Sequence, residues 1–392
     1  MTEALFWSAI AALAYTFAGY PAMMWALARV CPRPPRRADI RPRVTVLVAA
    51  YNEAAVIAGR IENCLALDYA PDRLEIVVAS DGSTDATVDV ARRHECPRRP
   101  GPAVRVIAYP WRRGKPSVLN ETIPRCHGDI VVLADARQRY DADAVRRLVE
   151  NFADPGVGAV SGELQLVNDS GVAVGDGVGA YWRYEKLIRR SESALDSTVG
   201  ATGAIYAIRR HLFEPMAADT LLDDVLIPVR IARRGYRVVF DDRARAWDRA
   251  VSTARQEYTR KVRTIGGVAQ LFAREPWLLL PGHRLWLQAV SHKLLRLVAP
   301  FLLLAALGTA ALLARHSAFY TAALTAQLVL YGAAAVGALV RHRDGRLARL
   351  LAIPYAFCLL NYTTLVALAR FATGRHSVQW RKAADATPVK AA

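Results

Sequence analysis

Two short apolar runs each end in a polar, partly acidic loop. Residues 44–50 lead into Tyr51-Asn52-Glu53, and residues 74–79 lead into a Ser-Asp-Gly-Ser-Thr-Asp loop that contains Asp81. A capped turn would explain one such loop, because Asp and Ser are good N-caps and Gly suits a turn. It does not explain two in succession. A site that binds a uracil ring and a ribose needs carboxylates, which accept hydrogen bonds from the ring N–H and the sugar hydroxyls.

Basic residues follow the third apolar run, residues 104–108. The segment Arg112-Arg113-Gly114-Lys115 precedes a helical pattern. A basic residue at a helix N-terminus is unfavourable for the helix dipole, and a bound anion would remove that penalty. A diphosphate is one candidate anion, and a solvated basic loop explains this segment equally well when it is judged alone.

Carboxylates occur at two further points. Asp135 directly follows the apolar run 130–134, a position suited to holding a divalent metal through oxygen. The nearby Asp141 and Asp143 precede a helical pattern, so helix capping and first-turn pairing account for them.

The adjacent Asp223 and Asp224 repel each other, which can raise the pKa of one toward the range of a general base. Taken alone, the pair is better explained as an N-cap for a helix over residues 225–233. Arg260 and Arg263 alone would pass as a solvated helix face.

The elements that position these residues alternate in type. The apolar runs 44–50, 74–79, 104–108 and 130–134 are strand-like, and helical patterns lie between them at 55–67, 84–94 and 116–125. This alternation predicts an α/β domain with a Rossmann-type parallel sheet and helices on both faces. Ligands of such sheets gather at the carboxyl ends of the strands, where the polar loops lie.

Hydrophobic and charged residues are segregated along the 392-residue chain. It is 53% hydrophobic and 22% charged, yet residues 5–28, 297–314, 317–340 and 350–369 contain no charged side chain. A membrane-spanning helix needs about 20 mostly apolar residues, so we expect transmembrane helices at both ends, one N-terminal and about three C-terminal. A signal peptide is disfavoured, because no basic residue precedes the first run and the run is too long.

The net charge of +17 has a simple source. Arginines cluster just after the first apolar run and between the last two, as expected for cytosolic loops. No nucleic-acid motif accompanies them, so we expect no nucleic-acid partner. The five cysteines lack metal-ligand spacing and are interpreted as reduced thiols.

Taken in order, these segments resemble the family 2 glycosyltransferases with a GT-A fold, over residues 44–267, and the flanking runs resemble membrane-bound polysaccharide synthases. The resemblance implies an inverting enzyme that uses a nucleotide-diphosphate sugar, with a UDP-sugar as the expected donor. It assigns the donor to Ala49, Tyr51, Glu53, Asp81, Lys115, Arg260 and Arg263, a divalent metal to Asp135, the acceptor side to Gly203 and Asp223, and the catalytic base to Asp224.

Two departures from the family pattern matter. Arg137 replaces the second Asp of the Asp-x-Asp metal motif, so one carboxylate and the substrate diphosphate would hold the expected Mg²⁺ or Mn²⁺. The Gln-x-x-Arg-Trp motif of processive synthases is also absent, and Gln379-Trp380-Arg381 lies beyond the last apolar run. A lipid-linked acceptor and a growing polysaccharide are therefore both open. The alternative function is a catalytically silent membrane scaffold that binds a nucleotide.

The expected organisation is a transmembrane helix at 1–30, a basic linker at 31–43, a cytosolic glycosyltransferase domain at 44–272, an interfacial helix at 273–296, transmembrane helices over 297–372 and a tail at 373–392. Trp277, His283 and Trp286 among apolar residues suggest the interfacial helix. The expected location is the bacterial inner membrane, with the catalytic domain cytosolic and the side of the tail open.

Overall fold

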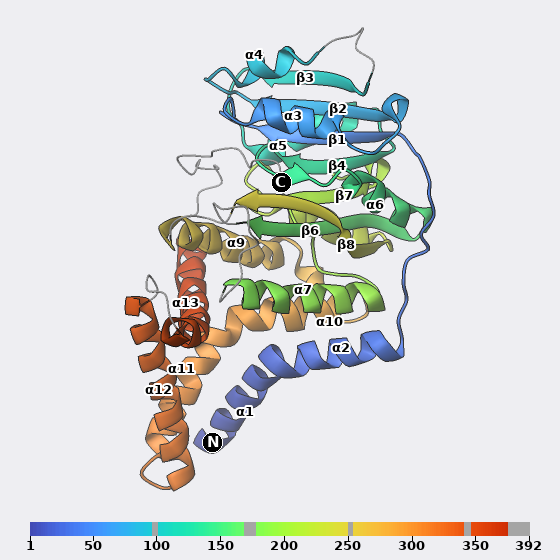
Figure 1. Ribbon diagram of the computed structural model, residues 1–392. Helices are drawn as coiled ribbons and strands as arrows, with labels where there is room; N and C mark the ends of the chain where they lie inside the picture. Colours follow the sequence, from blue (N-terminus) through green and yellow to red (C-terminus); the bar gives the residue numbers. More distant parts are fainter. Residues whose placement is uncertain (96–100, 168–177, 250–253, 341–345, 375–392) are drawn as a thin grey trace.

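The centre of the molecule is a mixed β-sheet. The computed structural model describes residues 1–95, 101–167, 178–249, 254–340 and 346–374. Within these residues the sheet has eight strands in the order β3-β2-β1-β4-β7-β6-β8-β5 (Figure 1). The strands are β1 Val44–Ala50, β2 Leu74–Asp81, β3 Ala103–Tyr109, β4 Ile130–Asp135, β5 Arg139–Tyr140, β6 Val157–Val167, β7 Ile205–Arg209 and β8 Arg237–Arg249.

The first half of the sheet is parallel, as the alternating pattern predicts. β1 pairs in parallel with β2 and β4, and β2 pairs in parallel with β3, whereas β7 is antiparallel to β4. The chain order reverses on either side of β1, which creates the switch point where α/β sheets bind ligands. The four strands expected from sequence are confirmed.

Helices cover both faces of this half. Successive residues of β1 point to opposite sides, so Val46 and Val48 belong to one hydrophobic core and Leu47 to the other. The three helical patterns expected between these strands are confirmed, with ends that differ by one to three residues, and the helix expected at 225–233 begins two residues earlier. The helices are α3 Ile57–Leu65, α4 Thr87–Arg92, α5 Lys115–Thr122, α6 Ala144–Glu150 and α8 Asp223–Arg233.

Two long helices lie between the sheet and the apolar helices. They are α7 Val178–Leu195 and α9 Ala254–Arg274, and Figure 1 shows both along the edge of the sheet domain nearest the helical column. Helix α7 packs beside α2, and α9 contacts α13. These two helices therefore connect the sheet domain to the apolar helices.

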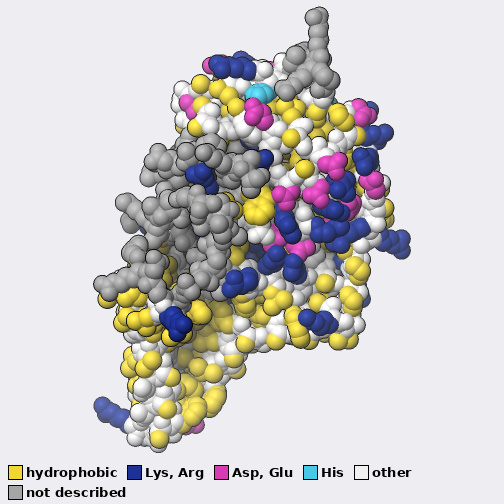
Figure 2. Space-filling model, in the orientation of Figure 1, with side chains coloured by type: hydrophobic (Ala, Val, Ile, Leu, Met, Phe, Trp, Pro, Cys, Tyr) yellow, Lys and Arg dark blue, Asp and Glu magenta, His cyan; other side chains and the backbone are white. Residues whose placement is uncertain are grey.

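Among the described residues, four helical segments are long and apolar enough to cross a membrane: Thr2–Val30, Trp286–Leu313, Ala318–Val340 and Arg346–Ala372. The first contains α1 Thr2–Ala14, a π-helical turn and α2 Tyr20–Val30. The second contains α10 Trp286–Gln288, a π-helical segment Ala289–Leu294 and α11 Leu295–Leu313. The last two are α12 Ala318–Val340 and α13 Arg346–Ala372. Figure 2 shows hydrophobic side chains over most of the lower part of the molecule and charged ones mainly above it.

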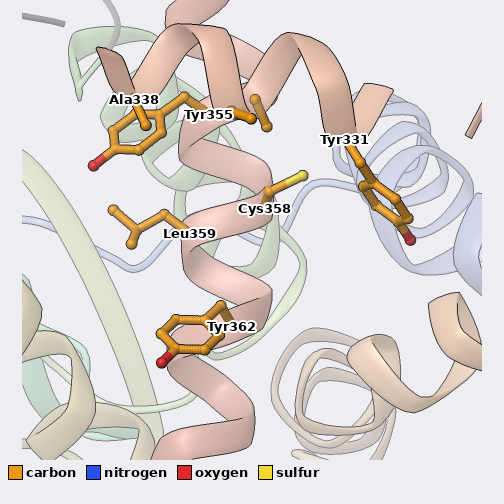
Figure 3. A pocket seen from close by; sticks show the side chains of 8 residues that line it. Tyr331, Ala338, Tyr355, Cys358, Leu359 and Tyr362 are labelled. Carbon is orange, nitrogen blue, oxygen red and sulfur yellow. The ribbon is translucent and has the colours of Figure 1, made fainter. Parts of the chain in front are cut away.

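Helices α12 and α13 approach closely and leave an apolar groove beside the contact. A Cβ on Gly337 would lie 2.7 Å from the carbonyl oxygen of Leu351, so glycine permits the approach. The groove is lined by aromatic and small side chains, among them Tyr331, Ala338, Tyr355, Cys358, Leu359 and Tyr362 (Figure 3).

The segment expected as one interfacial helix at 273–296 has a different structure. A short 3₁₀ turn spans Pro276–Leu279, and the helix that begins at Trp286 continues without a break into α11. The sequence predicted that this helix begins at residue 297, because the run without charged side chains begins there. His292 lies in this helical segment with its ring buried, and two glutamates of α7 hydrogen-bond to the ring nitrogens. The tail beyond residue 374 lies outside the described residues.

Candidate active site

The loops after β1 and β2 are joined by hydrogen bonds into one unit. The Asn52 side chain accepts a hydrogen bond from the backbone N–H of Thr84 at 2.8 Å, and the backbone N–H of Ala54 donates to Asp85 at 3.2 Å. Asn52 itself has a positive φ of 53°, a conformation that asparagine tolerates better than most residues. The two loops identified from sequence therefore lie side by side at the carboxyl ends of their strands.

The predicted base-binding residues lie in this unit. Ala49 is in register with Asp135 of β4, and Glu53 is buried, with its backbone N–H bonded to the Thr87 hydroxyl at 2.8 Å. The guanidinium carbon of Arg112 lies 3.9 Å from the centroid of the Tyr51 ring. One face of this ring is thus covered by a cation, which gives a favourable cation–π contact.

Asp81 holds the basic loop in place. Its two carboxylate oxygens accept hydrogen bonds from the backbone N–H groups of Arg113 at 2.7 Å and Gly114 at 2.8 Å. The neighbouring Gly82 has a φ of +62°, and a Cβ there would lie 2.3 Å from the carbonyl carbon of Trp111. Asp81 therefore has a structural role that the sequence did not reveal, next to its predicted contact with the nucleoside.

Lys115 joins two carboxylates from distant parts of the chain. Its Nζ lies 3.0 Å from Asp135 Oδ1 and 3.2 Å from Asp223 Oδ2. Burial alone would lower the pKa of Lys115, but Asp135, Asp223 and Asp224 raise it above its usual value. The sequence suggested that an anion offsets this charge at the start of α5. In the structure, protein carboxylates supply that negative charge.

Asp224 lies in the first turn of α8 and faces Gly203. The backbone N–H of Gly203 donates to Asp224 Oδ2 at 2.9 Å, and a Cβ on Gly203 would lie 2.8 Å from the same oxygen. Burial, followed by the charge of Asp223, raises the pKa of Asp224 to about 6. The N-cap of α8 is Leu222, with no side-chain cap, so the capping explanation of the aspartate pair is wrong.

Tyr206 is a site residue that sequence reasoning missed. It lies on β7 and is fully buried. Burial, and then the charges of Asp223 and Asp224, raise its pKa well above the usual value. A tyrosine within the apolar part of this strand, three residues after Gly203, was the available signal.

Helix α9 fixes the segment that precedes Asp223. Arg263 Nη2 donates to the Leu221 carbonyl at 3.1 Å, and the Gln270 side chain accepts from the Leu221 N–H at 2.9 Å. A Cβ on Gly267 would lie 2.4 Å from Leu222 Cγ, so the helix is in tight contact. Arg260 is exposed, and among the described residues its guanidinium contacts none of the site carboxylates.

The suspected metal ligands differ in position. Asp141 accepts a hydrogen bond from Trp247 Nε1 at 2.7 Å, and Asp143 pairs with Arg147 at 2.9 Å. Asp143 is the N-cap of α6, but its side chain makes no capping hydrogen bond, so ion pairing and not capping explains it. Asp135 instead lies at the end of a central strand.

The residues around Asp135 fit a divalent metal only together with a substrate. The described residues contain no group of three or more His, Cys, Asp or Glu side chains able to hold a metal. However, the carboxylates of Asp135 and Asp223 converge on one cationic point, the Lys115 Nζ. Magnesium often binds through one or two carboxylates plus substrate phosphates, which matches this donor set.

These features form one site. It has a loop pair suited to a nucleoside, a lysine and an aspartate suited to a diphosphate with a metal, and a carboxylate whose pKa suits proton removal near neutral pH. Such a site can bind a nucleotide-diphosphate sugar and deprotonate an attacking hydroxyl.

Comparisons with known proteins agree with this chemistry. Residues 42–267 match the family described as glycosyltransferase like family 2. A poly-β-1,6-N-acetyl-D-glucosamine synthase of Staphylococcus aureus is 26% identical over 247 residues, covering 62% of this chain and 58% of the synthase. The probable glycosyltransferase YdaM of Bacillus subtilis is 27% identical over 244 residues, covering 58% of this chain and 55% of YdaM. The chain thus matches less than two thirds of these relatives' length.

A solved structure matches over nearly the whole chain. The mannosyltransferase PcManGT from Pyrobaculum calidifontis, in complex with GDP-Man and Mn²⁺, is 26% identical with a TM-score of 0.71, covering 96% of this chain and 100% of that one. The family match spans more than half of the present chain. The chain therefore belongs to glycosyltransferase family 2 and has the GT-A fold.

Proposed function

We propose that the enzyme transfers a sugar from a UDP-sugar, with inversion, to a hydroxyl of a lipid-linked or growing polysaccharide acceptor at the bacterial inner membrane. The observation that carries this proposal is the placement of Asp224, with a pKa of about 6, beside Gly203 and close to the Lys115–Asp135 pair. The similarity to a polysaccharide synthase supports the acceptor class.

In the proposed reaction, Asp224 takes the proton of the acceptor hydroxyl. The acceptor oxygen forms a bond to the anomeric carbon as the bond from that carbon to the diphosphate breaks. The electron pair leaves with the nucleoside diphosphate. Lys115 and Arg263 stabilise the negative charge that develops on this leaving group.

A divalent metal would be held by Asp135 together with diphosphate oxygens, and when bound it would neutralise charge on the diphosphate. PcManGT was solved with Mn²⁺, which supports a metal in this enzyme. Asp135 and Asp223 both contact Lys115. A bound donor diphosphate would therefore change the charge that surrounds both carboxylates.

The membrane location is proposed from the exposed apolar helices. Large hydrophobic side chains of α1, α11 and α12 are exposed. The basic linker at 31–43 leads from α2 to the sheet domain, and its Arg33 N–H donates to the Ala194 carbonyl of α7 at 2.6 Å. Basic residues next to a span favour the cytosolic side, so the catalytic domain is assigned there. The exposed residues include Leu5, Trp7, Phe301, Leu304, Leu312, Phe319, Leu328 and Leu339.

The proposal is tested with purified protein in detergent and a panel of UDP- and GDP-sugars, by measuring nucleotide release with and without membrane lipid. Asp224→Asn should reduce transfer by about 10²–10⁴-fold, the usual contribution of a general base, and leave donor affinity intact. Asp223→Asn should have a milder effect. Near-wild-type turnover in a folded Asp224→Asn protein would remove Asp224 from the mechanism.

A further inference from the structure

The segment that leads to the aspartate pair lies outside the helices and strands of the fold. It covers residues 213–222, between the 3₁₀ turn Arg210–Leu212 and α8. Asp223 and Asp224 follow it directly, in the first turn of α8. Because no helix or strand ladder pairs the backbone of this segment, side chains of other elements must bind its N–H and carbonyl groups where they are buried. The position of the segment decides where both carboxylates lie.

Asn120 of α5 binds the segment through both polar atoms of its amide group. Its Nδ2 donates to the Met216 carbonyl at 2.7 Å, and its Oδ1 accepts a hydrogen bond from the Met216 N–H at 2.9 Å. An amide presents a donor and an acceptor side by side, which matches the two backbone groups of a single residue. The pairing therefore fixes both the position and the rotation of the chain at Met216, which is buried.

Gln270 of α9 binds the same segment in a similar way, nearer to the aspartates. Its Nε2 donates to the Asp219 carbonyl at 3.0 Å, and its Oε1 accepts from the Leu221 N–H at 2.9 Å. Gln270 and Leu221 are buried, so the loss of these bonds would leave buried polar groups unpaired, which is unfavourable. Together, the contacts of Asn120 and Gln270 form two amide pairs on the segment.

Helix α5 contacts this part of the chain a second time, through a charge. Lys115 lies five residues before Asn120 in α5, and its Nζ is 3.2 Å from Asp223 Oδ2. One short helix thus binds the segment at Met216 through a neutral amide and binds the residue that follows the segment through an ion pair. The helix that begins with the diphosphate-binding lysine therefore also positions the aspartate pair.

Donor binding affects these two contacts differently. Under the proposed function, the donor diphosphate binds at Lys115, so its negative charge competes with Asp223 for the ammonium group. Like charges repel, and the diphosphate therefore tends to displace the neighbouring aspartates. The amide pairs carry no net charge, so an anion does not weaken them in this way. They are the contacts that still bind the segment when the donor is present.

We propose that Asn120 and Gln270 are positioning residues that keep Asp223 and Asp224 in place while the donor diphosphate occupies Lys115. The inference rests on the proposed function, which assigns the diphosphate to Lys115 and the base to Asp224. Both amides act through the segment 213–222 and not by contact with the substrate.

The test follows hydrogen exchange by mass spectrometry in the full-length protein in detergent, with UDP and Mn²⁺ as the probe. Peptides within residues 217–226 should exchange slowly in the wild type, with or without the probe. Asn120→Leu keeps the size of the side chain but loses both bonds, so exchange should be at least about tenfold faster. Adding UDP and Mn²⁺ should accelerate it further in this variant. Asn120→Gln keeps the amide and should restore part of the protection.

Turnover supplies the second measurement. With UDP-sugar and membrane lipid as in the donor panel, kcat of Asn120→Leu should fall at least about tenfold, because a small misplacement of a catalytic group can cost up to 10²-fold. UDP affinity, measured by isothermal titration, should be unchanged. Gln270→Leu should give the same pattern from the other helix.

Asn63 of α3 offers a matched control, because it pairs with a backbone residue in the same way. Its Nδ2 donates to the Tyr140 carbonyl at 2.9 Å, and its Oδ1 accepts from the Tyr140 N–H at 2.8 Å. Asn63→Leu loses an equivalent pair of bonds, so its thermal midpoint should fall as it does in Asn120→Leu. Its kcat and the exchange of residues 217–226 should remain those of the wild type.

A folded Asn120→Leu protein that behaves like Asn63→Leu in kcat, or whose exchange does not respond to UDP and Mn²⁺, overturns the proposal. Should Asn120→Leu fail to fold, Asn120→Ser, which loses at least one of the two bonds, is compared with Asn63→Ser by the same measurements. Asp224→Asn is assayed in parallel. If it loses turnover as expected while the Asn120 variants match their controls, only this inference is wrong. If it turns over like the wild type, the proposed function is wrong and this inference falls with it.

Discussion

The raised pKa of Asp224 predicts how activity depends on pH. The base acts only when ionised, so kcat/KM should fall about tenfold per pH unit below pH 6 and level off above it. The folded state favours the protonated form, so the stability that this group contributes is present below pH ~4 and is lost as the pH rises through about 6. Asp224→Asn should therefore lack the acidic limb and melt at pH 8 no lower than the wild type. A pH profile of both proteins and their thermal midpoints check this, and an unchanged acidic limb in the variant would assign the limb to another group.

The variants Asp135→Ala and Asp143→Ala form a matched pair that tests metal dependence. Asp135→Ala should abolish transfer and the effect of added Mn²⁺ on nucleotide affinity, because this carboxylate ends a central strand beside Lys115. Asp143→Ala should leave transfer largely intact, since Asp143 pairs with Arg147 on the surface of α6. Isothermal titration of nucleotide with and without Mn²⁺ measures the difference. An inactive but folded Asp141/Asp143 double variant would show that the metal site is misassigned.

Gly203 should not tolerate even a methyl group. The added Cβ of Gly203→Ala would lie 2.8 Å from Asp224 Oδ2, too close for a normal contact, so the carboxylate must move. We expect transfer to fall by at least about tenfold with donor affinity unchanged, because a small misplacement of a catalytic group can cost up to 10²-fold. Gly59→Ala on α3, where a Cβ would have open space, is the control. Equal activity of the two variants would contradict the proposed position of the base.

At the scale of elements, alanine substitutions at two adjacent glycines of α9 should have opposite effects on stability. A Cβ on Gly267 would lie 2.4 Å from Leu222 Cγ, so Gly267→Ala should push α9 away from the segment before Asp223 and lower both stability and turnover. A Cβ on Gly266 has no neighbour within 4 Å, so Gly266→Ala should stabilise the helix by up to about 1 kcal/mol. Thermal unfolding in detergent, combined with transfer assays, compares them. A stabilised and fully active Gly267→Ala protein would show that α9 does not position the site.

The sequence predicted the bounds of some elements more accurately than the contacts between them. The strands β1 to β4 were predicted well, because a buried parallel strand is a local apolar run with turn signals at its ends. Contacts between distant segments have no such local signal. The sequence placed Arg263 near the donor but not its bond to the Leu221 carbonyl, and it gave no role to Gln270. The sequence also predicted that the apolar helix excludes the charged residues before 297. His292 nevertheless lies in that helix, where its ring is buried between two glutamates.

At the scale of the whole molecule, a buried polar cluster joins the N-terminal helix, α7 and the C-terminal helices. The Tyr20 hydroxyl donates to Glu192 at 2.6 Å, and the same glutamate oxygen lies 2.8 Å from His292. Burial alone would raise the pKa of Glu192, but His292 holds it below the usual value. The ionised carboxylate therefore binds partners from both ends of the chain. This contact fixes the apolar helices relative to the sheet domain.

That arrangement predicts a labelling pattern. Phe6 of α1 packs against Tyr320, near the turn between α11 and α12, whereas the exposed Cys31 follows α2 on the side of the sheet domain. In a background without the other cysteines, native Cys31 should resist a membrane-impermeant maleimide in spheroplasts and react after permeabilisation. A His316→Cys variant, at an exposed position in the α11–α12 turn, should react before permeabilisation. Both thiols should react in detergent, which controls for accessibility. Labelling of Cys31 in intact spheroplasts would place the catalytic domain outside the membrane and contradict a donor drawn from the cytosol.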